Sequence, residues 1–319
     1  MHLDSRIKAL AATASVAGLL VAMTAGGSAS AAPQAHASAC KVSNNVEAIL
    51  DDSGSMNGTD PSHFRTKLME AYIGLGSNQG KTLGAVKFSS DASVLFNPLV
   101  IGPNTKATML AGFNNLVDSG GTDYDAGFSL ANSSNPGATS RIFLSDGAPG
   151  TDSDLHRSPN ITTYVVGLGV GNDANAVTEL TQIANETGGP PPIFIEDAGQ
   201  LQTAAAAISA GQSCKRLLSF TDVFNRVGQS AGHNAKAKGK VMDILTSWPN
   251  IGSVLNLGVG LPKAKSSVAS AAKVQIKRSK GSNFASIRIK GLKKGQKVKI
   301  KIKAKALNGP TTATTQVIR

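Results

Sequence analysis

The stretch from residue 46 to residue 208 alternates short apolar runs with segments whose apolar residues recur at helical spacing, and this alternation restricts the fold more than any other feature. Apolar runs of about four to eight residues are typical of strands buried on both faces, whereas helical spacing predicts helices that cover those faces. The pattern therefore predicts an α/β fold with a doubly wound, mostly parallel sheet.

The individual elements follow from the same pattern, with Gly, Pro, Asp and Ser residues marking their ends. Predicted strands occupy residues 46–50, 83–88, 93–96, 141–144, 163–168 and 193–195. Predicted helices occupy residues 61–75, 107–116, 124–131, 174–186 and 198–208. The sequence thus predicts six or so strands that alternate with a similar number of helices.

Charge divides the chain into two unlike parts. Residues 40–214 carry 8 Lys and Arg against 17 Asp and Glu, whereas residues 215–319 carry 22 against 2. Residues 1–39 precede both parts and combine a short charged start, an apolar stretch and a run of small residues, as in a secretory signal. We therefore expect a leader over 1–39, an acidic domain over 40–214 and a basic domain over 215–319.

The two cysteines of the chain, Cys40 and Cys214, lie at the two ends of the acidic part. Export to an oxidising compartment allows a disulfide to form and persist, so we expect these two residues to pair. Lipidation of Cys40 is the alternative, although Cys40 lies far beyond the apolar stretch. No second long apolar run follows the leader, and we expect a secreted protein without a membrane-spanning segment, released or held at the surface non-covalently.

Oxygen-bearing side chains follow several of the predicted strands. Asp51, Ser53 and Ser55 come just after the first strand, Thr122 lies in a glycine-bordered loop, and Asp146 follows a later strand. Ligands of open α/β sheets bind at the carboxyl ends of the strands. Carboxylate and hydroxyl oxygens suit a hard cation such as Mg²⁺, which keeps several waters and takes few protein ligands. These five residues are therefore the candidate metal ligands.

The motifs Asp-x-Ser-x-Ser at 51–55, Gly-Thr at 121–122 and Leu-Ser-Asp-Gly at 144–147 resemble the metal-ion-dependent adhesion site of von Willebrand factor A domains, also called integrin inserted-type domains. The resemblance covers essentially all of 40–214, including the segments 164–169 and 183–189. It implies that Ser53, Ser55 and Thr122 approach the metal directly, and that Asp51 and Asp146 act largely through bound water.

The same resemblance implies a binding function. Mg²⁺ is the expected cation, with Ca²⁺ or Mn²⁺ as alternatives, and its open coordination position is expected to receive an acidic side chain of a protein ligand. Asp52, Asp123, Asp125 and the loop 147–155 are expected to rim the site. The opposing interpretation is a set of turn-rich loops without metal, because Asp, Ser and Gly gather in any turn after a strand.

Enzymatic hydrolysis is not predicted. A Ser-His-Asp arrangement would have to use His156, and nothing like a nucleophile elbow accompanies it. We therefore expect a binding protein and not an enzyme, with His156 as a solvated loop residue.

From residue 215 onward the apolar pattern changes to a period of two. It is most regular at 297–305, where apolar residues alternate with lysines, and it recurs around 274–276 and 287–289; the connection 291–296 separates two of these segments. We expect a small antiparallel β-sandwich with one solvated face, and a first strand plus a flexible stretch within 215–240. The closing segment is similar to immunoglobulin-like repeats of bacterial surface proteins.

The exposed lysines of this segment have two possible roles. They are Lys297, Lys299, Lys301, Lys303 and Lys305. They are expected to bind an anionic cell-wall polymer, with affinity that falls as salt rises; alternatively, they only protect exposed strands from aggregation. Specific nucleic-acid binding is not expected, because residues able to stack on bases are few.

Overall fold

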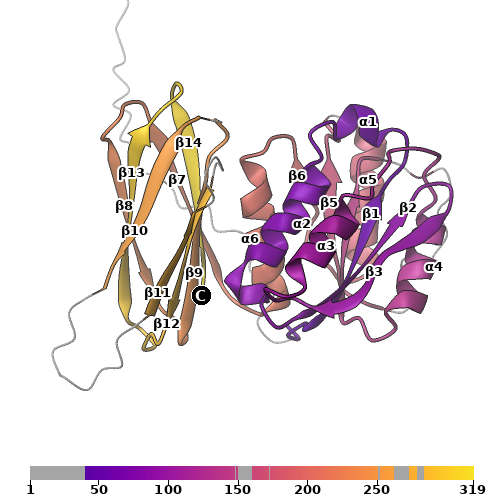
Figure 1. The fold of residues 1–319 in the computed structure, drawn as a ribbon, viewed down its shortest axis with the longest axis horizontal. Coiled ribbons are helices and arrows are strands. Elements are labelled where there is room, and N and C mark those ends of the chain that lie inside the picture. Colours follow the sequence, from indigo (N-terminus) through magenta and orange to yellow (C-terminus); the bar gives the residue numbers. More distant parts are fainter. Residues whose placement is uncertain are drawn as a thin grey trace, which may run out of the picture. The chain divides into compact units, whose positions relative to one another are not determined.

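The computed structural model describes residues 40–147, 149, 160–171, 173–250, 252–261, 273–278 and 284–319. The first part of the described chain forms a six-stranded sheet with helices on both faces (Figure 1). Its strands are β1 (Asn45–Asp51), β2 (Thr82–Phe88), β3 (Ala92–Val100), β4 (Ser140–Ser145), β5 (Thr163–Leu168) and β6 (Ile193–Ile195). Its helices are α1 (Met56–Thr59), α2 (Phe64–Gly74), the 3-10 turn η1 (Gly76–Asn78), α3 (Lys106–Phe113), α4 (Tyr124–Ser134), α5 (Ala174–Glu186) and α6 (Gln200–Gln212).

The order of the strands is β3-β2-β1-β4-β5-β6, with β1 and β4 in the middle. Every neighbouring pair is parallel except β2 and β3, which are joined by a short turn and run antiparallel. The predicted doubly wound, mostly parallel sheet is therefore confirmed. Because β1 and β4 are parallel neighbours, the residues that follow them lie at one edge of the sheet.

Alternate residues of the central strand β1 pack against opposite layers of helices. Val46, Ala48 and Leu50 belong to a core shared with α2, α3 and α6. Ile49 belongs to the opposite core, which contains residues of α4 and α5. All five residues from Val46 to Leu50 are buried, so the apolar run was a correct signal for a strand covered on both faces.

Helix α2 begins three residues later than the sequence pattern indicates. The Asp60 carboxylate accepts hydrogen bonds from the backbone N–H groups of Phe64 and Arg65, which have no partners within the helix. Pro61 therefore lies in the turn before the helix and not in its first turn. The short helix α1 was not predicted, whereas β5, α5 and β6 begin and end at the predicted residues.

The predicted disulfide between Cys40 and Cys214 is confirmed. It joins the segment before β1 to the residue two places beyond α6. Beside it, the Ser43 backbone N–H donates a hydrogen bond to the Gln212 carbonyl oxygen, at 2.7 Å. The two ends of the α/β part are thus held together both covalently and by the backbone.

The second part of the chain forms two antiparallel sheets. Their strands are β7 (Leu217–Phe224), β8 (Ser230–Lys236), β9 (Val241–Ser247), β10 (Val254–Gly260), β11 (Lys273–Arg278), β12 (Phe284–Lys290), β13 (Lys297–Ala306) and β14 (Thr311–Ile318). One sheet has the order β10-β13-β8 and the other β11-β12-β9-β14-β7. Apolar residues of both sheets, among them Ile300 and Ile287, share one core, as expected for an all-β sandwich.

The prediction for residues 215–240 was correct for the first strand, which is β7, and wrong for the flexible stretch, because β8 occupies most of it. β8 has the sequence Ser-Ala-Gly-His-Asn-Ala-Lys, which contains few residues of high strand propensity. It forms a strand because it pairs along its whole length with β13. Among the described residues, no helix is long and apolar enough to cross a membrane.

Candidate metal site

Four of the five predicted ligands lie in one hydrogen-bonded cluster at the carboxyl ends of β1 and β4. Ser55 Oγ donates to Asp146 Oδ1 at 3.1 Å, and Ser53 Oγ lies 3.0 Å from Ser55 Oγ. Asp51 joins the cluster because its Oδ1 accepts a hydrogen bond from the backbone N–H of Ser53, at 2.8 Å. The parallel pairing of β1 with β4 brings these oxygens together.

The fifth residue, Thr122, lies in a loop that touches this cluster through the backbone. The Gly54 N–H donates to the Gly120 carbonyl oxygen at 3.1 Å, and a Cβ at Gly54 would lie 3.3 Å from that oxygen. Gly120 has φ +90°, a conformation that favours glycine. Among the described residues, no hydrogen bond joins Thr122 itself to the other four ligands. The Gly54–Gly120 hydrogen bond places its loop beside them, and the Thr122 side chain is partly exposed.

Within the cluster, Asp51 is the most deeply buried residue and Ser55 the most exposed. Asp51 is fully buried, Asp146 is 7% exposed, and Ser55 is exposed. Burial raises the pKa of Asp51 to about 6; hydrogen bonds from Ser145 and Ser53 act in the opposite direction, and the nearby Asp146 carboxylate raises it further. Two carboxylates thus lie close together in a poorly hydrated place, an arrangement that a cation would stabilise.

Two residues that support the cluster were not predicted as part of it. Ser145 Oγ donates to Asp51 Oδ2 at 2.6 Å and lies 2.9 Å from the Tyr124 hydroxyl. Thr59, at the end of α1, donates from Oγ1 to Asp146 Oδ2 at 2.5 Å. Ser145 could have been found as the last residue of a buried strand, whereas nothing in the sequence indicates Thr59.

Asp52 does not rim the site as predicted; it is buried and holds the loop that leads to Thr122. Its Oδ1 accepts from the N–H groups of Val117 and Asp118 at 2.7 and 2.9 Å, and Lys87 Nζ donates to its Oδ2 at 2.7 Å. The buried Arg65 guanidinium pairs with Asp118 and lies 4.0 Å from Asp52 Oδ1. The two positively charged side chains near Asp52, which are Lys87 and Arg65, are therefore already paired with Asp52 and Asp118.

Of the other predicted rim residues, the structure describes Asp123 but not most of the loop. Asp123 precedes α4, and its carboxylate accepts from the Ala126 N–H at 3.0 Å, which satisfies a donor of the first helical turn. Most of the loop 147–155, and His156 beyond it, lie outside the described residues. That these residues rim the site and influence which ligand it binds stays a prediction.

The chemistry of the clustered side chains fits a hard divalent cation. Hydroxyl and carboxylate oxygens are the atoms that Mg²⁺ and Ca²⁺ prefer, and nitrogen or sulfur ligands are absent from the cluster. Among the described residues no three His, Cys, Asp or Glu side chains gather as a metal site. Any cation held here therefore depends on hydroxyl oxygens as well as on Asp51 and Asp146.

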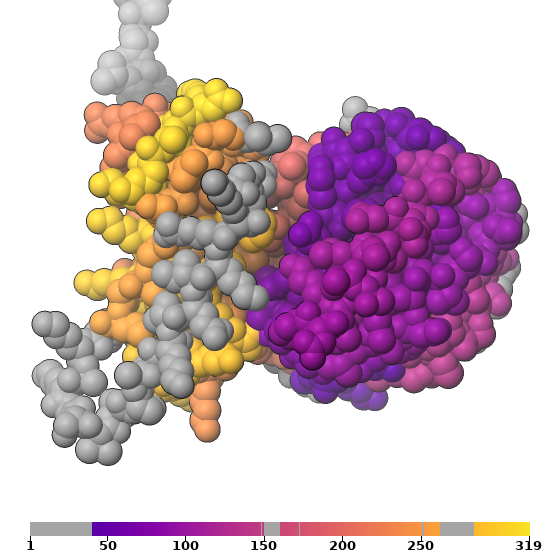
Figure 2. All heavy atoms as spheres, viewed as in Figure 1, coloured from indigo at the N-terminus to yellow at the C-terminus, as the bar shows by residue number. Residues whose placement is uncertain are grey.

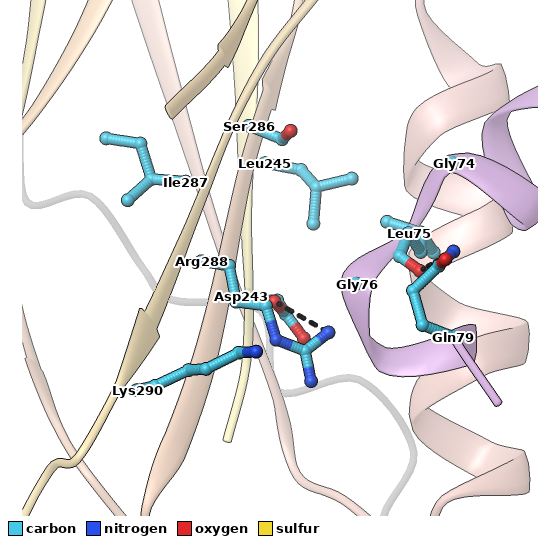
Figure 3. A pocket seen from close by; sticks show the side chains of 10 residues that line it. All are labelled: Gly74, Leu75, Gly76, Gln79, Asp243, Leu245, Ser286, Ile287, Arg288 and Lys290. Carbon is cyan, nitrogen blue, oxygen red and sulfur yellow. Dashed lines mark hydrogen bonds and ion pairs between the residues drawn. The ribbon is translucent and has the colours of Figure 1, made fainter. Parts of the chain in front are cut away.

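A separate hollow contains none of the predicted ligands. The ten residues drawn in Figure 3 come from the end of α2 and the turn after it, and from β9 and β12. Arg288 Nη1 lies 3.8 Å from Asp243 Oδ1 within this hollow. Burial raises the pKa of Asp243, and the positive charge of Arg288 lowers it. The hollow holds a paired acid and base and no cluster of oxygens, so it is not a second candidate for the metal.

Residues 47–148 match the von Willebrand factor type A domain family. The matched segment includes most of β1, all of β2, β3 and β4, and all five predicted ligands. Residues 47–148 therefore form a segment of the von Willebrand factor A type. The similarity of residues 215–319 to immunoglobulin-like repeats is not tested by this match and stays a prediction.

Several solved structures are similar to this chain. A von Willebrand factor type A protein from Catenulispora acidiphila shares 16% identity with a TM-score of 0.47, over 85% of this chain and 62% of that one. Proximal thread matrix protein 1 of the mussel byssus, in a structure with a zinc-occupied MIDAS motif, shares 19% identity with a TM-score of 0.41, over 56% and 50%. An aerotolerance-related membrane protein from Bacteroides fragilis shares 19% identity with a TM-score of 0.42, over 54% and 98%.

The present chain thus spans less than two thirds of the length of the first two of these proteins. No curated protein matches it.

Proposed function

We propose that the α/β part binds a protein ligand through a divalent cation. The residues that would hold the cation are Asp51, Ser53, Ser55, Thr122 and Asp146. The observation that carries this proposal is the single cluster of oxygens at the ends of β1 and β4, buried at Asp51 and open at Ser55. The family match over residues 47–148 supports it.

The roles proposed for the five residues are those that the resemblance to von Willebrand factor A domains implies. Ser53, Ser55 and Thr122 would contact the cation directly, and Asp51 and Asp146 would act largely through bound water. The bound cation would supply positive charge to an acidic side chain of the protein ligand. Mg²⁺ is the expected cation, because this small set of hydroxyl and carboxylate oxygens suits an ion that keeps several waters; Ca²⁺ and Mn²⁺ are alternatives.

We further propose that this protein is secreted and that it is not an enzyme. Its leader over 1–39 has the composition of a secretory signal, and the Cys40–Cys214 disulfide is of the kind that persists in an oxidising compartment. A non-covalent association with the cell surface fits the basic part of the chain. The Mg²⁺ or other cation would bind a ligand here and would not activate water for hydrolysis.

Calorimetric titration with Mg²⁺ and with Mn²⁺ tests the cation site without any knowledge of the ligand. We expect one cation per chain for the natural protein, and loss of measurable binding for Asp146→Ala and Ser53→Ala. Glu70→Gln is a matched control, because Glu70 is an exposed carboxylate on α2 away from the cluster. Retention of full cation affinity in Asp146→Ala, with thermal unfolding unchanged, would contradict the proposal.

Ligand binding needs a second experiment. Surface extracts are passed over the immobilised protein in Mg²⁺ and in EDTA, and a retained protein is then titrated against the natural chain and against Asp146→Ala. We expect retention only in Mg²⁺ and loss in the variant. The competing function is that of a structural envelope protein, in which the α/β part is a scaffold and the lysine-rich part binds cell-wall polymer; equal binding in Mg²⁺ and EDTA would favour it.

A further inference from the structure

Five lysines form a row on the exposed face of β13. This lysine ladder consists of Lys297, Lys299, Lys301, Lys303 and Lys305, all exposed, with buried apolar residues between them. Neighbouring members lie two residues apart, which is about 7 Å along a strand, so the ladder is about 27 Å long. Figure 2 shows side chains of the yellow C-terminal segment standing out from the surface as separate projections.

Small and uncharged residues flank the middle of the ladder on both sides. Lys301 pairs with Gly232 of β8 and with Gly258 of β10. Lys303 pairs with Ser230 and Lys299 with Gly260 at neighbouring rungs, and Asn234 and Asn256 complete these positions. The three middle lysines therefore project from a floor of Gly, Ser and Asn residues, and their paired neighbours carry no large side chain that would limit the approach of a long molecule.

The position of β13 in its sheet argues against a purely protective role. Lysines guard sheets against aggregation when they lie on edge strands, whose backbone groups are unpaired. β13 is the middle strand of the order β10-β13-β8 and is paired on both sides. It has no free edge to protect. The concentration of charge on this strand therefore calls for another explanation.

No acidic residue neutralises the ladder within the described part of the chain. Residues 215–319 contain two acids, Asp222 and Asp243. Asp222 Oδ2 lies 2.7 Å from His233 Nε2, and Asp243 is buried beside Arg288. Lysines about 7 Å apart lie within one Debye length of about 8 Å and repel one another. A bound polyanion would remove this repulsion.

Further lysines continue the charge at one end of the ladder. Lys236 pairs with Lys297 across the two strands. The turns that follow β8 and β12 lie side by side, because the Gly295 N–H donates to the Ala237 carbonyl oxygen at 2.8 Å. Four exposed lysines belong to these turns, namely Lys238, Lys240, Lys293 and Lys294. The basic surface is thus an elongated strip that broadens at this end.

We propose that the lysine ladder binds a linear phosphodiester polymer of the polyol phosphate type, extended along β13. Three backbone bonds advance an extended chain by about 3.3–3.6 Å, so phosphates six bonds apart, as in a glycerol phosphate polymer, repeat at about 7 Å. That repeat matches the ladder. This deepens the surface-attachment part of the proposed function and does not involve the cation site.

The composition of the face argues against a nucleic acid. β8, β10 and β13 contain no Phe, Tyr or Trp, so nucleic-acid bases would find no stacking surface. They also contain no Arg, but this does not separate a phosphate polymer from a uronic acid polymer, because the Arg fork suits carboxylate and phosphate groups alike. Single-stranded DNA and a uronic acid polymer are therefore the comparison ligands.

The test measures binding of fluorescently labelled poly(glycerol phosphate) to the full chain in EDTA, by anisotropy, over a range of salt. The variant is Lys299→Gln/Lys301→Gln/Lys303→Gln. The control is Lys41→Gln/Lys106→Gln/Lys290→Gln, which removes equal charge at exposed positions outside the ladder. Thermal unfolding verifies that both variants fold.

We expect the natural chain to bind with a log–log salt slope of about −3.5, for five contacts with a single-stranded polyanion. The ladder variant should lose about two units of that slope and at least tenfold in affinity, and the control should keep both. Equal weakening of the two variants would overturn the proposal in favour of diffuse charge. Tighter binding of DNA or polyuronate, or no binding, would also overturn it. Because EDTA is present, failure of the cation site does not affect the result.

Discussion

A buried carboxyl group in β1 should make the stability of the α/β part depend strongly on pH. Glu47 is 1% exposed, and its Oε2 accepts a hydrogen bond from Asn135 Nδ2 at 2.9 Å. Gly84, its partner in β2, makes room for it, because a Cβ there would lie 2.2 Å from Glu47 Oε2. Burial raises the pKa of Glu47 to about 8 from 4.5, although Asn135, Ser134 and the Arg141 charge lower it.

The direction of the effect follows from proton binding. Between pH 4.5 and about 8 the folded protein keeps the Glu47 proton, whereas the unfolded chain has lost it. Stability therefore falls as pH rises through this window, by up to about 1.4 kcal/mol per pH unit and about 5 kcal/mol in total. Glu47→Gln keeps the shape and the acceptor for Asn135 but has no proton to lose. The variant should equal the natural chain near pH 4.5 and exceed it by several kcal/mol at pH 8.

Urea unfolding of both proteins at a series of pH values measures this difference. Tyr72, Tyr124 and Tyr164 are the only tyrosines and all lie in the α/β part, whereas the single tryptophan, Trp248, follows β9. The near-ultraviolet tyrosine signal thus follows the part that contains Glu47. Taking the difference between the two proteins cancels the other acids that titrate. A difference that does not change with pH would refute the reasoning, because Glu47 would then be ionised in the folded state throughout.

Two further predictions concern the disulfide and the hydrogen bonds by which Asp52 holds the loop that leads to Thr122. Replacing Cys40 and Cys214 by Ser opens a link with a sequence separation of 174, and we expect the free energy of unfolding to fall by up to about 5 kcal/mol in urea; an unchanged midpoint would contradict this. Asp52→Ala leaves the N–H groups of Val117 and Asp118 without their acceptor, and should cost about 3–5 kcal/mol. It should also weaken Mn²⁺ binding in calorimetry, whereas full Mn²⁺ affinity would show that the Thr122 loop does not need this support.

The sequence was sufficient for the fold of the α/β part because its signals are local and agree with one another. Apolar runs such as 163–168 are bounded by loop residues, and burial of every residue in the run is typical of a strand in a parallel sheet covered on both faces. The candidate ligands were found for a related reason. They follow strands, and parallel strands bring their carboxyl ends to one edge, so a list of strand ends already places Asp51 near Asp146.

The direction of individual polar side chains could not be predicted in the same way. Asp52 lies between candidate ligands in sequence, yet its carboxylate turns inward to Val117 and Asp118, a choice set by backbone groups 65 and 66 residues away. β8 is a similar case in the other part of the chain. Its own residues do not favour a strand, and its conformation is determined by hydrogen bonding to β13.

The two proposed sites would both recognise acidic partners, but by opposite physical means. The oxygen cluster around Asp51 is itself negative and would attract a carboxylate only through a bound cation, whereas the lysine ladder carries fixed positive charge. Contacts in the partly buried cluster are screened little by salt, and those of exposed lysines are screened strongly. EDTA should therefore abolish the first activity and spare the second, and a rise from about 50 to 200 mM salt should weaken the second far more than the first. A single binding activity that responded equally to both treatments would mean that one of the two sites carries no binding of its own.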